Sequence, residues 1–399
     1  MASDLKDLTH PLDASALLEQ LPVRPRILAL GEPTHGEEAL LAVRNRLFRQ
    51  LVEQEGFRTI TLESDCLRAL AVDAYVTTGE GTLDQAMEQG LSHGWGAYAG
   101  NRDLVGWMRA HNEHRPSGEH VRFAGFDGPL EITAASSPRR ALLELHALLS
   151  AHVDPGLLPC TAETLDRLLG DDGGWTDPDA MTDPGRCTGR SAEARQLRLL
   201  TDELVALFDT QAPHLAAALT PDAWDRARLY ARTATGLLRY HHAMADDSPA
   251  RMTRLCALRD LMMAQNLLAL AERGPVLVAA HNSHLQRPRS SMTMWQGRVE
   301  WWSAGALVEA RLGSGYAVVA TAVGTLRHRG VEAPPPETVE GLLYGLTEEP
   351  CLVDVDGLTA TLGDPSPRVS SWFGYAPVDP AHLAALDGLV YVKDVVPGT

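Results

Sequence analysis

Lysine is almost absent from this chain, which has only Lys6 and Lys393 and takes nearly all of its positive charge from arginine. Acidic residues outnumber basic ones by 52 to 35, so the formal net charge is −17. Such an acidic surface repels the phosphate backbone of nucleic acids and the headgroups of anionic membranes. We therefore expect neither a nucleic-acid partner nor a membrane partner.

Long hydrophobic runs and paired cysteines are also missing. No apolar run approaches the roughly 18 residues of a membrane-spanning helix, and the N-terminal stretch lacks the basic and apolar regions of a signal peptide. On this ground we expect a cytoplasmic protein. The five cysteines are scattered, odd in number and without a CxxC motif, which argues against a disulfide framework and against a zinc ribbon.

The motifs of several large enzyme classes are missing as well. No GxGxxG follows the first predicted strand and no P-loop occurs, which argues against dinucleotide and nucleotide chemistry. There is no HExxH, the helical zinc motif of metalloproteases. We also expect no serine nucleophile of the α/β-hydrolase kind, which needs a strained turn between a strand and a helix. The chemistry that remains is that of histidine and carboxylate.

Three segments far apart in the chain share one pattern, an apolar run long enough for one strand followed abruptly by polar side chains. They are ILALGEPTHG (27–36), TITLESD (59–65) and VLVAAHNSH (276–284). Strands buried on both faces read as continuous hydrophobic runs, which is typical of a parallel sheet covered by helices. The sequence therefore predicts an α/β fold with a mostly parallel central sheet flanked by helices.

The rest of the pattern divides the chain into a core and an insertion. Further apolar runs that predict strands lie at 121–126, 315–322, 351–355 and 388–392. Helical periodicity is clearest at 191–211, 222–245 and 250–272. We predict an α/β catalytic core made of 1–130 and 273–399, and a helical insertion subdomain at 131–272 that forms one wall of the substrate cleft.

Acid–base side chains stand at the ends of the predicted strands. They are Glu32, His35, Glu63, His281 and His284. Ligands of open α/β sheets bind at the carboxyl ends of the strands, so we expect these side chains to converge on one cleft. A carboxylate beside an imidazole fixes its tautomer and stabilises the imidazolium, so Glu32 and His35 are predicted to form a general base.

The second pair of histidines, His281 and His284, leaves two alternatives open. Histidines at this spacing bind a metal only with a third ligand in a suitable pattern, which the sequence does not supply. The other alternative is that His281 acts as proton donor or oxyanion partner opposite His35, while His284 contacts the substrate. We favour the second alternative and predict that the protein uses no metal and no cofactor.

Arg44 lies on the apolar face of the helix predicted over 37–54, where Leu40, Arg44, Leu47 and Leu51 follow one another at spacings of four, three and four. A buried guanidinium needs an anion beside it. We predict a charge-assisted pair with Glu32 or Glu63. The alternative is that the side chain reaches round the edge of the apolar stripe into water.

Five further residues are candidates for contacting the substrate. They are Asp127 after the third predicted strand, Arg259 and Asn266 on one face of a helix, and Trp95 and Tyr98 in a glycine-rich loop. The two aromatic rings would stack on an apolar substrate. The alternative for the two aromatic residues is packing inside the core, and for Arg259 and Asn266 it is a packed helix face with a polar edge. Asp127 could instead support the site from behind the residues that contact the substrate.

Five motifs together resemble the erythromycin esterase family in order and spacing. They are GEPTHGEEALLAVRNRLFRQL (31–51), TLESD (61–65), VRFAGFD (121–127), RDLMMAQNLL (259–268) and AHNSHL (280–285), and the resemblance continues into APPPETVEGLLYGL (333–346). The motif residues of the family fall on Glu32, His35, Arg44, Glu63 and His281. The resemblance implies an α/β core with added helices, His35 as general base, and hydrolysis of a macrolide lactone ester without a covalent intermediate.

The leading interpretation is an esterase that opens a macrolide-like lactone or a related natural-product ester. His35 would take a proton from water, Glu32 or Glu63 would orient the imidazole, Arg44 would hold the carboxylates or the oxyanion, and His281 would protonate the leaving alkoxide. The runner-up is an acyltransferase or cyclase acting on a natural-product intermediate, and a third interpretation is a binder without turnover. The expected partner is a hydrophobic small-molecule ester or lactone, in antibiotic resistance or in natural-product biosynthesis.

Overall fold

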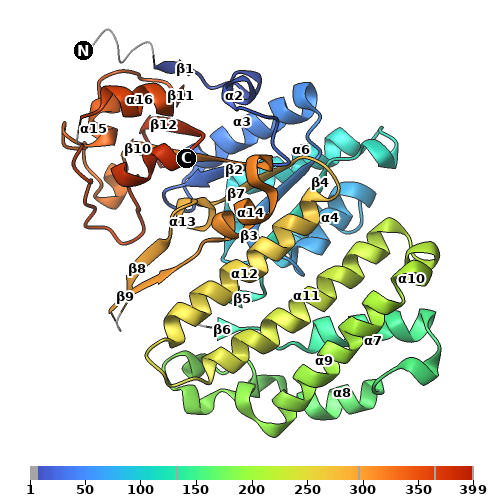
Figure 1. Cartoon of the computed structure of the whole chain (residues 1–399). Coiled ribbons are helices and arrows are strands. Elements are labelled where there is room, and N and C mark those ends of the chain that lie inside the picture. The colour runs from blue at the N-terminus through green and yellow to red at the C-terminus, as the bar shows by residue number, and fades with distance from the viewer. Residues whose placement is uncertain (1–7, 132–133, 295–296, 364, 398–399) are drawn as a thin grey trace. The chain divides into compact units, whose positions relative to one another are not determined.

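The computed structural model describes residues 8–131, 134–294, 297–363 and 365–397, which Figure 1 draws as a ribbon. Its central element is an eight-stranded sheet with the strand order β1-β11-β12-β10-β2-β7-β3-β4. The strands are β1 (Thr9–Pro11), β2 (Ile27–Glu32), β3 (Thr59–Asp65), β4 (Arg122–Asp127), β7 (Val276–His281), β10 (Tyr316–Thr325), β11 (Cys351–Val353) and β12 (Gly388–Asp394). β12, β10, β2, β7 and β3 pair in parallel, and β1 and β11 pair antiparallel at one edge.

The middle strands of the sheet are buried along almost their whole length, as continuous apolar runs predict. All ten residues of β10 are buried, and so are the first five residues of β2 and of β7. The last residues of β2 and β7, Glu32 and His281, are only partly buried. The predicted mostly parallel sheet is confirmed, and its polar strand ends lie at the carboxyl edge.

Most of the sheet belongs to a compact unit made of Met1–Ser64, Arg68–Phe126 and Leu267–Thr399. The other elements of this unit are α2 (Ala14–Gln20), α3 (Glu38–Glu55), α4 (Ala69–Thr78), α5 (Leu83–Gly90), α6 (Ala99–Asn112), α13 (Asn282–Leu285), the separate ladder of β8 (Ser290–Met294) and β9 (Gly297–Trp301), α14 (Ala304–Leu312), α15 (Val339–Tyr344) and α16 (Val355–Thr361). Leu40, Leu47 and Leu51 of α3 pack into the same core as the strands. This is the apolar face that their spacing predicts.

A second compact unit consists of Asp65–Leu67 and Asp127–Asn266 and has its own apolar core. Its elements are the short ladder of β5 (Leu130–Glu131) and β6 (Ala134–Ala135), then α7 (Arg139–His152), α8 (Ala162–Leu169), α9 (Ala192–Thr210), α10 (Ala212–Ala218), α11 (Pro221–Met244) and α12 (Arg251–Ala271), of which α12 continues past the unit. The helices predicted for this region correspond to α9, α11 and α12, whereas the ladder was not expected. That this unit walls a substrate cleft stays a prediction.

Within the described ranges, no helix combines the length and the apolar character that crossing a bilayer requires.

Candidate active site at the strand ends

The strand register brings the acid–base residues to one edge of the sheet. β2 and β7 are parallel neighbours, and Glu32 lies directly opposite His281 at their carboxyl ends. β3 pairs in parallel with the other side of β7, so Glu63 reaches the same edge. His35 stands in the turn between β2 and α3. These side chains therefore lie close together, as the strand pattern predicts.

His35 and Glu32 form a hydrogen-bonded pair. Nδ1 of the imidazole lies 2.7 Å from Oε1 of Glu32. A carboxylate only accepts, so Nδ1 carries the hydrogen and Nε2 is left with its lone pair. The His35 side chain is 36% exposed. The pair has the chemistry of a general base.

Glu63 is a buried carboxylate that joins three groups of the site. Its side chain is only 4% exposed, and its Oε2 lies 3.7 Å from Nε2 of His35. The same oxygen accepts a 2.9 Å hydrogen bond from the backbone N–H of His281. Oε1 lies 3.3 Å from Nε2 of His284. Nε2 of His35 and Oε2 of Glu63 are thus two acceptors that lie 3.7 Å apart.

His281 is held as a neutral imidazole by its surroundings. Its Nδ1 accepts a 3.2 Å hydrogen bond from the backbone N–H of Ser283, and the Ser283 hydroxyl lies 2.7 Å from the same nitrogen. The imidazole also donates to the carbonyl of Pro33, yet burial, followed by the nearby His35, lowers the pKa of His281 to about 3. A neutral imidazole donates a proton poorly. The low pKa argues against the predicted role of His281 as proton donor to the leaving alkoxide, and its role as oxyanion partner stays a prediction.

Two further outcomes concern residues close to His281. His284, which we expected to contact the substrate, is 8% exposed and lies against Glu63 instead. Ser283 and the Pro33 carbonyl, which fix the orientation of the His281 ring, were not singled out by any motif. The available signal was the position of Ser283 two residues after the strand-end His281, because serine often forms hydrogen bonds with groups this close in the chain.

The turn that carries His35 is shaped by glycine and by aromatic rings. Gly36 has a φ of +79°, and a Cβ at this position would lie 2.4 Å from the hydroxyl of Tyr98. Only glycine adopts this backbone without strain. The ring of Trp95, a residue that is 7% exposed, lies 5.2 Å from the imidazole of His35 between ring centroids. Trp95 and Tyr98 thus line the His35 turn, and their stacking on a substrate stays a prediction.

Arg44 is buried on the inner face of α3, with 4% of the residue exposed. Its hydrogen bonds go to amide oxygens, where we expected a carboxylate. Nε and Nη2 donate to Oδ1 of Asn45 at 3.1 and 2.8 Å, and Nη2 donates to Oδ1 of Asn101 at 2.8 Å. Burial lowers the pKa of Arg44 to about 10, against the opposing effect of Glu32 and other carboxylates. Arg44 therefore remains a cation that acts on Glu32 through its charge and not through a direct bond.

Asp127 and Arg259, both predicted to contact substrate, are bound to each other in the second unit. Asp127 is fully buried, and Nε and Nη2 of Arg259 lie 2.7 to 3.2 Å from its two oxygens. Asn266, the third candidate there, accepts a 3.2 Å hydrogen bond from Nε of Arg232. The polar groups of these three side chains thus have partners within the protein. Contact of any of them with a substrate stays a prediction.

One segment has the GxSxG spacing of a nucleophile elbow, which the sequence-based interpretation missed. It is GLSHG (90–94). It connects α5 with the short 3-10 helix Trp95–Ala97, so it is not a turn between a strand and a helix. Ser92 is 4% exposed, and its hydroxyl lies 3.1 Å from that of Ser64. Although His93 has a φ of +57°, a buried serine of this kind is not a nucleophile for an incoming ester.

Among the residues that the structure describes, no group of three or more His, Cys, Asp or Glu side chains is arranged to hold a metal ion. The predicted independence from metal stays a prediction.

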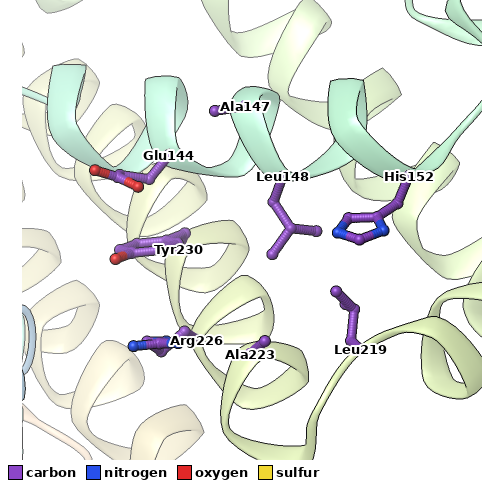
Figure 2. Close-up of a pocket in the computed structure, with 8 residues that line it drawn as sticks. All are labelled: Glu144, Ala147, Leu148, His152, Leu219, Ala223, Arg226 and Tyr230. Carbon is purple, nitrogen blue, oxygen red and sulfur yellow. The ribbon is translucent and has the colours of Figure 1, made fainter.

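A pocket of about 360 Å³ lies in the second unit between α7 and α11. Figure 2 shows its lining, which is Glu144, Ala147, Leu148, His152, Leu219, Ala223, Arg226 and Tyr230. Glu144, Arg226 and Tyr230 lie toward one side and His152 toward the other. None of the predicted site residues contributes to this lining.

Comparison with known proteins bears on this site. The family model of erythromycin esterase matches residues 52–395, most of the chain. Glu63, His281 and His284 fall inside the matched range, whereas His35 and Glu32 precede it.

Three solved structures share the fold over nearly all of this chain. A protein from Bacillus cereus has a TM-score of 0.73 at 18% identity, covering 100% of this chain and 97% of that one. A succinoglycan biosynthesis protein has a TM-score of 0.67 at 16% identity, with coverages of 98% and 96%. The erythromycin esterase EreC, in the open conformation of a histidine-to-asparagine mutant, has a TM-score of 0.67 at 18% identity, with coverages of 96% and 93%. At such identities the likeness concerns the fold alone.

Proposed function

The chain belongs to the erythromycin esterase family, and on that premise we propose that it hydrolyses a macrolide-like lactone or a related ester by direct attack of water. The observation that carries this proposal is the position of His35 between two carboxylates. Glu32 lies 2.7 Å from Nδ1 of the imidazole, and Glu63 lies 3.7 Å from Nε2. In this proposal Glu32 fixes the tautomer of His35, and the attacking water molecule binds to both Nε2 of His35 and Oε2 of Glu63.

The reaction begins with that water molecule, which donates one hydrogen to Nε2 of His35 and the other to Oε2 of Glu63. Its oxygen attacks the ester carbonyl carbon while Nε2 takes the proton. Glu32 stabilises the imidazolium that forms. The tetrahedral intermediate collapses as the bond to the alkoxide breaks, and the imidazolium of His35 returns the proton to the alkoxide. The products are a carboxylic acid and an alcohol, which remain one molecule when the substrate is a lactone.

His281, His284 and Arg44 support this base and do not exchange protons in the proposed reaction. The neutral His281 ties the end of β7 to the Pro33 turn, and its backbone N–H holds one oxygen of Glu63. His284 lies against the other oxygen. The positive charge of Arg44 attracts the nearby carboxylate of Glu32. Each of these groups acts on a carboxylate that lies close to His35.

The first test is turnover of a panel of macrolide lactones and simpler esters, followed by mass spectrometry of the products. A gain of one water marks hydrolysis of a lactone. No change of mass marks rearrangement or cyclisation within the substrate, and a product joined to an added alcohol or amine marks acyl transfer. Intact mass of the quenched enzyme tests the second part of the proposal, since direct attack by water leaves no acyl adduct on the protein.

The second test removes the base while leaving the fold intact. His35→Asn and Glu32→Gln are expected to lower kcat roughly 10²- to 10⁴-fold with little change in melting temperature, because general-base catalysis is worth this much. His114→Gln is the matched control, since His114 is an exposed histidine of the same unit outside the site. Turnover by His35→Asn close to that of His114→Gln would remove His35 from the mechanism.

A further inference from the structure

A short loop near the end of the chain presents apolar side chains to solvent. It is VSSWFG, residues 369–374, which we call the apolar loop. Val369 is 89% exposed and Phe373 is 80% exposed, more than any other large apolar side chain in the described ranges. The loop contains no charged residue. Isolated exposed apolar residues are ordinary, but two such side chains on six residues call for something that covers them.

The apolar loop is held firmly at both ends, although it has no helix or strand. The Arg368 guanidinium is buried and donates to the carbonyls of Val323, Gly324 and Glu332 at 2.7 to 2.8 Å. Tyr375 at the other end is 3% exposed. Both residues that flank the loop are thus fixed in the protein interior. A loop anchored in this way loses less conformational entropy on binding than a free one.

One end of the apolar loop is bound to the turn that carries His35. The backbone N–H of Ala376 donates a 2.9 Å hydrogen bond to the carbonyl of Pro33. The imidazole of His281 donates to the same carbonyl. Ala376 lies two residues after the loop and Pro33 two residues before His35, so the chain that follows the loop contacts the turn that carries the proposed base.

A second contact links the apolar loop to the part of the turn that follows His35 in the sequence. The guanidinium of Arg329 lies 5.3 Å from the centre of the Trp372 ring. Nε of Arg329 also lies 3.3 Å from Oε1 of Glu37, two residues after His35. Glu37 is 3% exposed, whereas the Arg329 side chain that links it to Trp372 is 48% exposed. The two contacts therefore reach residues on either side of His35 in the sequence, Pro33 and Glu37.

We propose that the apolar loop binds the apolar body of the ester whose carbonyl is attacked beside His35, with Phe373 and Val369 as residues that determine specificity. This inference rests on the proposed function. The occupant is the apolar part of that ester, because the loop offers apolar contact without any charge. The inference requires that a ligand covering Phe373 extends to the Pro33–Glu37 turn, where its ester meets the base.

The size of the effect follows from the area that such a ligand would cover. Removing the phenyl ring by Phe373→Ala is expected to lower kcat/KM for erythromycin, used as a bulky lactone, by roughly 10-fold. The same variant should lower kcat/KM for p-nitrophenyl acetate by less than about twofold, because this ester is too small to reach from the base to the loop. Phe373→Leu, which keeps an apolar side chain, should restore most of the loss, and Val369→Ala should give a smaller loss.

The experiment compares these variants with Val23→Ala as the matched control. Val23 is 45% exposed and precedes the amino end of β2, so it lies at the opposite end of the strand from the site. Turnover of both esters, erythromycin binding by calorimetry and the oligomeric state by sedimentation are measured for each variant. A loss of erythromycin turnover in Phe373→Ala, absent in Val23→Ala and for the small ester, supports the inference.

The remaining outcomes separate the loop from the proposed function. If the wild type hydrolyses erythromycin and Phe373→Ala does so equally well, the loop inference fails while the hydrolase proposal stands. If the wild type binds erythromycin without turnover and Phe373→Ala loses that binding, the loop inference stands and the hydrolase proposal fails. No binding and no turnover by the wild type overturns both. A changed oligomeric state in Phe373→Ala, with unchanged kinetics, also overturns the inference and shows that another protein chain covers the loop.

Discussion

Replacing Arg259 by leucine tests whether the Asp127–Arg259 pair is structural. The side chain of Asp127 is fully buried and that of Arg259 is 19% exposed, with their closest oxygen and nitrogen 2.7 Å apart. Arg259→Leu removes the paired cation and leaves the carboxylate inside the second unit. Breaking a buried pair in this way costs about 3–5 kcal/mol, and the partial exposure of Arg259 favours the lower end. We therefore expect a loss of about 3 kcal/mol, or roughly 150-fold in the unfolding equilibrium.

The double variant Asp127→Asn/Arg259→Leu shows where that loss comes from. Its neutral amide oxygen can keep the 2.8 Å hydrogen bond from the backbone N–H of Gly128, so we expect about half of the stability to return. Arg254→Leu on the same helix is the control. Arg254 is 57% exposed, and its partner Asp246 keeps a second arginine, so the expected loss is below about 1 kcal/mol.

Urea unfolding followed by circular dichroism at neutral pH measures all three variants. If Arg259→Leu unfolds like the wild type but loses ester turnover, the pair is not structural and Arg259 contacts the substrate, as the sequence first suggested. If Arg259→Leu and Arg254→Leu lose equal stability, burial of the pair contributes nothing measurable.

Three other expectations concern stability and metal. Arg44→Met should lower the free energy of unfolding by about 3 kcal/mol, because the buried amide oxygens of Asn45 and Asn101 lose a charged donor; thermal melting checks this, and an unchanged melting temperature contradicts it. Burial lowers the pKa of His241 from 6.5 to about 4, so the unfolded state binds more protons between these values and stability falls as the pH falls through them. Through this histidine, the free energy of unfolding of the wild type should fall by about 2 kcal/mol between pH 8 and pH 5. His241→Phe should not show this part of the fall. EDTA should leave ester turnover intact and elemental analysis should find no stoichiometric transition metal; activity that is lost with EDTA and restored by one ion would contradict both.

The sheet and the position of the site could be predicted because both depend on patterns within short segments. A strand buried on both faces must be apolar throughout, so β2, β7 and β10 were recognisable from their own residues. Parallel strands bring their carboxyl ends to one edge, which made the meeting of Glu32, His35 and Glu63 predictable without any knowledge of distances.

The partners of the charged side chains could not be predicted in the same way. The helical periodicity of α3 indicated that Arg44 faces inward, but Asn101, which accepts its hydrogen bond, comes 57 residues later. Asp127 and Arg259 are 132 residues apart, and the sequence offered each only as a separate candidate for contacting the substrate. Arg368, which anchors the apolar loop through three backbone carbonyls, belongs to no motif.

The amino-acid sequence alone determined which strands are central and which acid–base residues share their carboxyl edge. Both follow from short segments, because a buried strand is apolar throughout and its direction is that of the chain. Only the tertiary structure decided that His281 is neutral, that Arg44 binds amides and that the chain after the apolar loop contacts Pro33. The physical reason is that a proton or a hydrogen bond depends on the local dielectric and on atoms within about 3 Å. Those atoms come from distant parts of the chain, and folding alone brings them together.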